Sequence, residues 1–143
     1  MWALIKPALN NILVFMLLAV GSNSVMADWI AVTESDEKTL TAYVDPKTIK
    51  LDGDKAKVWI LIDFKNQQKI VLDGSLYLSM KAFVEFDCKE NYYRSLAVHV
   101  LTKNMGKGNP AAKPVNPKHV KWKPIAPESI HASVKNYVCR TID

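Results

Sequence analysis

Apolar and polar residues alternate with a period of two along much of the chain. The clearest case is residues 76–88, where Met80, Ala82, Val84 and Phe86 share one face and charged residues occupy much of the other. That alternation is typical of a strand with one buried and one solvated face. Residues 55–65 are mostly apolar on both faces, which predicts a central strand covered on both sides.

Weaker patterns complete a sheet. Residues rich in β-formers predict strands over 28–33, 39–44 and 92–102, and a short edge strand over 120–125 that Pro124 limits. In the strand over 92–102 the residues expected on the core face are Leu96, Val98 and Val100. The polar turn at 89–91 pairs this strand antiparallel with the one before it. Residues 51–54 read as a tight turn.

The last third of the chain changes pattern. Residues 103–118 contain two glycines and three prolines and predict an irregular, exposed loop. Pro127 and Glu128 mark a helix start that suits the missing N–H and the helix dipole. The stripe formed by Ile130, Val134, Tyr137 and Val138 then predicts a helix to about Val138. The expected fold is α+β: about five to six antiparallel strands with one C-terminal helix packed on the sheet.

The N-terminus has the layout of a cleaved secretory signal over residues 1–27. Lys6 supplies positive charge, residues 12–20 form an apolar run, and small residues precede a cleavage site after Ala27. A transmembrane anchor is the alternative, but asparagines at 10, 11 and 23 shorten the run. The expected domain is 28–143, with no later membrane-spanning segment. We expect this domain to be exported to the periplasm or the cell surface, or secreted. A lipoprotein is not expected, because no cysteine lies near residue 28.

Export changes how the two cysteines are interpreted. In an oxidising compartment Cys88 and Cys139 are expected to form a disulfide. A disulfide that closes a loop of that length stabilises the fold by about 4 kcal/mol. The alternative is a reactive thiol, although neither cysteine belongs to a CxxC motif.

Charge is unevenly distributed. The chain carries a net charge of +5, yet no acidic residue lies between Glu90 and Glu128. The basic residues of that stretch, with one aromatic residue among them, are the candidate binding residues: Arg94, Lys103, Lys107, Lys113, Lys118, Lys121, Trp122 and Lys123. Such a surface attracts anionic polymers or acidic protein segments. The alternative to a binding surface is a solvated loop without a partner. For Trp122, the alternative to a binding role is that it covers the edge of the sheet. Nucleic acid is not expected, because no recognition motif is present.

Catalytic constellations are sparse. Glu85 and Asp87 lie on one strand face as a candidate carboxylate pair, but a solvated face beside Lys81 explains them as well. His99 has no accompanying nucleophile motif, so a packed or surface position is expected. The glycines around Lys107 lack the full phosphate-loop pattern. We therefore expect no enzyme activity, no cofactor and no metal.

An ordered series of short motifs resembles the bacterial surface-adhesin protein E family. The series includes Trp29, Tyr43-Val44-Asp45, Ile49, Val58-Trp59, Asp63-Phe64, Ser79-Met80-Lys81, Glu85-Phe86-Asp87-Cys88, Arg94, Met105-Gly106-Lys107-Gly108, Trp122, Ile125, Pro127, Ser129 and Val138-Cys139. The resemblance implies a small antiparallel sheet with a C-terminal helix, paired cysteines, and adhesins that bind host extracellular-matrix and serum proteins and dimerise. The absent lipidation cysteine departs from the adhesin that names the family.

Two functions follow as hypotheses. The first is an exported, non-catalytic domain that recognises host matrix or serum proteins or anionic envelope components through the basic loop. The second is a periplasmic structural or accessory protein that acts through homo-oligomerisation, in which an exposed sheet edge pairs two copies as a homodimer.

Overall fold

Among the residues that the structure describes, the fold is an antiparallel sheet with one α-helix packed on it. The computed structural model describes residues 27–140, so the expected signal segment lies outside the described residues except for Ala27. The sheet has seven strands in the order β1-β2-β4-β5-β6-β7, with β3 beside β4. Their bounds are β1 Ile30–Glu34, β2 Leu40–Val44, β3 Lys50–Asp52, β4 Lys55–Lys69, β5 Leu76–Asp87, β6 Tyr92–Leu101 and β7 Lys123–Pro124. The α+β prediction is confirmed, and β3 replaces part of the expected turn at 51–54.

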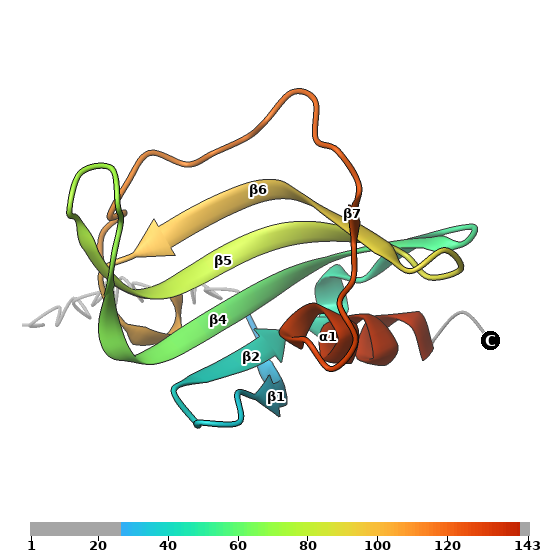
Figure 1. The fold of residues 1–143 in the computed structure, drawn as a ribbon, viewed down its shortest axis with the longest axis horizontal. Coiled ribbons are helices and arrows are strands. Elements are labelled where there is room, and N and C mark those ends of the chain that lie inside the picture. The colour runs from blue at the N-terminus through green and yellow to red at the C-terminus, as the bar shows by residue number, and fades with distance from the viewer. Residues whose placement is uncertain (1–26, 141–143) are drawn as a thin grey trace, which may run out of the picture.

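Helix α1, Ile130–Cys139, packs on β1, β2 and β4 (Figure 1). It begins at Ile130, later than the start expected at Pro127 and Glu128, because Glu128 adopts a left-handed φ of +60°. Ser129 caps the helix instead, and its Oγ accepts a hydrogen bond from the N–H of Ala132 at 3.1 Å. The apolar stripe is confirmed, since Val134 and Val138 are fully buried. No helix within residues 27–140 is long and apolar enough to cross a membrane.

The core lies between α1 and one face of the sheet, which we call the helix face. Val44, Val58, Val84 and Phe86 have no exposed surface there. Burying an apolar side chain of this size contributes about 1.5–3 kcal/mol, so this face supplies most of the driving force for folding. The central strand predicted over residues 55–65 and the alternating strand predicted over 76–88 are both confirmed.

A bulge changes the face that β6 presents. The pairing of β5 with β6 shifts between Phe83 and Val84, which places Ser95 opposite Val84 and Tyr93 opposite Phe86. Tyr93 therefore packs against the core, and Val98, on the other side of the bulge, packs there as expected. Leu96, which was expected on the core face, lies at this bulge. The expected alternation therefore holds only for Val98 and Val100, because an inserted residue reverses the side-chain faces that precede it.

The opposite face of the sheet, here the back face, is partly covered as well. The short helix η2, Asn104–Gly106, contacts β4 and β5. Leu61, which points to this face, is fully buried. The sequence predicted β5 with one wet face, but this loop and neighbouring side chains shield part of it.

Candidate functional site

The predicted basic loop follows the outer edge of β6 before it reaches β7 (Figure 1). Backbone hydrogen bonds join Val98 to Val115 in both directions at 3.0 Å, and the N–H of Ala111 donates to the carbonyl of Val100 at 2.8 Å. The loop is irregular as predicted, yet its residues 109–115 are attached to the edge of β6. The side chain of Lys113 therefore projects from a backbone held in place.

Six lysines of the predicted set are exposed. They are Lys103, Lys107, Lys113, Lys118, Lys121 and Lys123. We call these six the basic loop lysines. None of them forms an ion pair with a carboxylate among residues 27–140. Their charges are thus free to act on an anionic partner, although screening by salt limits each of them.

Arg94 and Trp122, the other two candidates, are engaged within the fold. The Arg94 side chain donates to Oε1 of Glu85 from Nε at 2.7 Å, and its Nη2 lies 2.6 Å from the same oxygen. The guanidinium also lies over the Trp122 ring, 4.4 Å from its centroid. The stack joins the segment before β7 to the back face. Arg94 and Trp122 thus make contacts within the fold, whereas the basic loop lysines form no ion pair among the described residues.

Glu85 is not on a solvated face. Its side chain is 7% exposed and also lies 3.7 Å from Nζ of Lys57. The solvated reading is wrong for this residue, because Arg94 and Lys57 cover the carboxylate. Asp87 does not join it in a catalytic pair: its Oδ1 accepts the turn N–H groups of Lys89 and Glu90 at 3.1 and 3.0 Å.

The loop containing Met105-Gly106-Lys107-Gly108 is pinned to the back face by two side chains. Oδ1 of Asp63 accepts from the N–H of Met105 at 2.7 Å, and Oγ of Ser79 accepts from the N–H of Gly106 at 2.9 Å. A Cβ on Gly108 would lie 2.4 Å from Oγ1 of Thr102, so this position requires glycine. The N–H groups of residues 105 and 106 are thus bound to the protein rather than offered to a phosphate.

His99 packs as expected. Its ring centroid lies 5.7 Å from that of Trp59, which in turn stacks on Phe83 at 5.3 Å. Trp29, Trp59, Lys81 and His99 line a hollow of about 360 Å³ on the back face. Sequence reasoning did not find this hollow, because its residues come from four different strands or their flanks.

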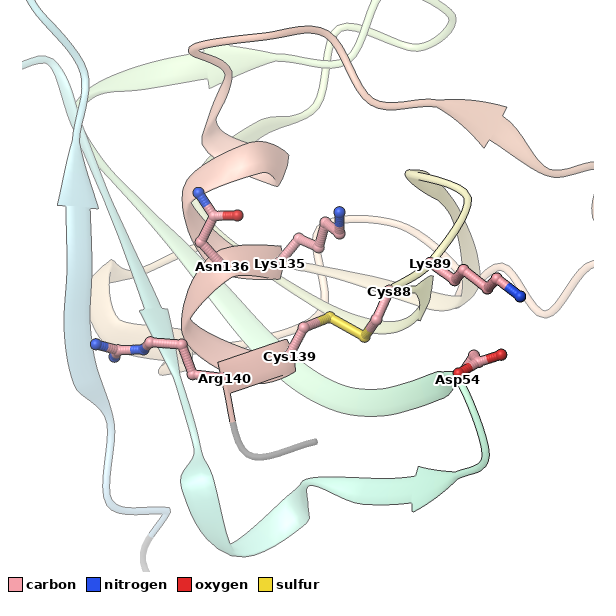
Figure 2. Close-up of a pocket in the computed structure, with 7 residues that line it drawn as sticks. All are labelled: Asp54, Cys88, Lys89, Lys135, Asn136, Cys139 and Arg140. Carbon is pink, nitrogen blue, oxygen red and sulfur yellow. A yellow bond between two sulfur atoms is a disulfide. The ribbon is translucent and has the colours of Figure 1, made fainter. Parts of the chain in front are cut away.

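The disulfide is confirmed and joins the end of β5 to the last turn of α1. The Cα atoms of Cys88 and Cys139 are 5.7 Å apart. Figure 2 shows the bond beside a polar hollow of about 480 Å³, with Asp54 on one side and Arg140 on the other. Both sulfurs are consumed by the bond, so the reactive-thiol alternative is wrong. Within the described part of the chain, no group of three His, Cys, Asp or Glu residues could hold a metal ion.

An apolar cavity also lies under the basic loop, on the helix face of the sheet. Its volume is about 330 Å³, and Ile60, Ile62 and Val98 are among its lining residues. The strand patterns predicted an apolar face, but nothing in them showed that part of it stays unfilled.

The fold is shared with solved structures of Haemophilus influenzae protein E. One of them matches with a TM-score of 0.57 at 11% identity, over 82% of this chain and 87% of that one. A second crystal form gives 0.59 at 11% identity, over 82% and 91%. Protein E from the non-typeable organism gives 0.55 at 12% identity, over 82% and 79%. At these identities the likeness shows the fold.

The sequence itself carries the assignment to a family. A search of curated proteins finds no match. The family model described as Surface-adhesin protein E matches residues 29–140, which include all the motifs from Trp29 to Cys139. This chain therefore belongs to the surface-adhesin protein E family.

Proposed function

We propose that this protein is an exported, non-catalytic adhesin domain that binds anionic surfaces through the basic loop lysines. The partners are host matrix or serum proteins, or anionic components of the cell envelope. One observation carries the proposal: six exposed lysines project from a loop anchored to the sheet edge, in a stretch without acidic residues. Family membership supports adhesion as the general activity.

The proposal includes export. Cleavage after Ala27 yields a domain that begins at Asp28, and the intramolecular disulfide suits an oxidising compartment. Without a lipidation cysteine near residue 28, the protein reaches the periplasm, the cell surface or the medium without a lipid anchor. Cell fractionation and N-terminal sequencing of the exported protein test this part.

Binding to immobilised heparin, as a defined polyanion, and to a coat of matrix proteins tests the surface. A triple variant, Lys107→Glu, Lys113→Glu and Lys118→Glu, is expected to lose most of the binding and its dependence on salt. The matched control reverses three exposed lysines outside the loop, at Lys50, Lys55 and Lys65. If both variants lose binding equally, only the overall charge matters and the basic loop is not the site.

The homodimer remains a second candidate, favoured by one observation. β1 is the last strand of the sheet at one side, and Ile30 in it is 44% exposed. Such an edge offers unpaired backbone groups to a second copy. Sedimentation at several concentrations tests it: Ile30→Lys should shift a dimer to monomer, and a wild-type monomer at all concentrations would exclude the dimer.

A further inference from the structure

The apolar cavity under the basic loop continues the hydrophobic core. Ile60, Ile62, Ala82 and Val84 belong both to the core and to the cavity lining. Helix α1 covers the part of the sheet formed by β1, β2 and β4. Over β5 and β6 its place is taken by the loop, which contributes Val115, Pro117 and Val120 to the opposite wall.

The size and chemistry of the cavity match a ligand site. Small-molecule sites have volumes of about 300–1,000 Å³ and are mostly apolar with a few polar groups. Protein interiors are otherwise close-packed, so an unfilled apolar space of this size can accommodate a ligand. Its volume of about 330 Å³ and its mostly apolar lining are therefore suited to an apolar chain.

The polar groups of the lining gather together. Lys123 pairs with Tyr93 in the sheet, and the Tyr93 ring stacks on His131 with centroids 3.9 Å apart. Lys123 and His131 both line the cavity, and burial and then the lysine charge lower the pKa of His131. Among residues 27–140, no carboxylate lines the cavity. This group therefore favours an anionic head attached to the apolar chain.

We propose that the cavity binds one long-chain fatty acid, with its hydrocarbon chain between β5–β6 and the loop and its carboxylate beside Lys123. This site is distinct from the proposed polyanion surface, because the ligand enters the interior while the other basic loop lysines act on the exterior. Fatty acids are chemically matched to it: one apolar chain, one negative charge and no bulky polar body.

Titration of the purified protein with a fluorescent fatty acid, followed by displacement with palmitic acid or its uncharged alcohol, tests the proposal. Saturable binding of one molecule per chain is expected. Ser95→Phe points a ring into the cavity from β6 and should weaken binding of both acid and alcohol about tenfold or more. Lys123→Glu should weaken the acid several-fold and leave the alcohol unchanged, while Lys50→Glu, on the exposed strand β3, should change neither.

Val115→Trp fills the cavity from the loop wall and serves if Ser95→Phe does not fold. Val115 is 56% exposed, so the larger side chain is tolerated there. The proposal is overturned by three results: no saturable binding to the wild type, unchanged affinity in a folded cavity-filling variant, or equal loss of acid and alcohol in Lys123→Glu. Heparin binding is measured in parallel, since its loss or retention reports on the proposed function and not on this cavity.

Discussion

The two faces of the sheet are closed by different kinds of interaction. On the helix face, α1 and the sheet bury apolar side chains, and one disulfide joins their ends. On the back face, individual polar contacts do this work: Asp63 and Ser79 hold the loop, and Arg94, which pairs with Glu85, stacks on Trp122 in the segment before β7. The helix face is therefore expected to determine global stability, while the back face determines which loops are held in place.

Breaking the disulfide is expected to have the largest effect. Cys88→Ser removes a bond between residues 51 positions apart, which should lower the free energy of unfolding by about 4 kcal/mol. Denaturant unfolding measures the loss, and Cys139 should then react with thiol reagents. Cys139→Ser is the matched control and should be equally unstable. Two reactive thiols in the oxidised wild type would contradict the pairing.

On the back face, Arg94→Met should cost about 2 kcal/mol, because the buried Glu85 carboxylate loses its closest partner. Lys57 remains at 3.7 Å and limits the loss. Thermal or denaturant unfolding measures it. Adding Glu85→Gln to Arg94→Met should recover part of the stability. An Arg94→Met variant as stable as the wild type would show that this face contributes little.

Asp63→Ala should act locally. It removes the acceptor of the Met105 N–H and of the Asn104 side-chain amide, at 2.7 and 3.1 Å. We expect a loss of about 1 kcal/mol, together with faster amide exchange at residues 104–108 than elsewhere. Ser79→Ala should do the same through Gly106. Uniform acceleration across the helix face would mean that the two faces are not separable.

The smallest effect concerns pH. Burial, and then the charge of Lys123, lower the pKa of His131 below its ordinary value of 6.5. The unfolded chain therefore takes up this proton first as the pH falls, so stability decreases from about pH 6.5 downward until the folded form is also protonated. His131→Phe should remove this part of the pH dependence, and Lys123→Met should reduce it. An unchanged slope in His131→Phe would assign it to other groups.

Sequence patterns predicted the helix face well and the back face poorly. The alternation of Met80 to Phe86 and the stripe from Ile130 to Val138 are local periodicities, and they identify which side is buried. Glu85 occupies a polar position in the same alternation, yet it is buried. Its burial depends on Arg94 and Lys57, which are brought to it by strand pairing.

The candidate site likewise has a part that the sequence predicted and a part that only the structure showed. Composition alone located the basic loop lysines, because a stretch without acidic residues is visible in the sequence. The different roles of Arg94 and Trp122 were not visible. Those roles arise from contacts between β5, β6 and the segment before β7, which local sequence patterns do not predict.

The sequence by itself determined the fold class, the disulfide partners, the helix and the family, since each depends on local periodicity, residue count or ordered motifs. Only the tertiary structure decided which polar residues are buried, where the loop is pinned, and that an apolar cavity lies beneath it. The physical reason is that the free energy of burying a polar group, or of leaving a cavity unfilled, depends on residues distant along the chain. Packing in the folded protein decides which of those residues become neighbours.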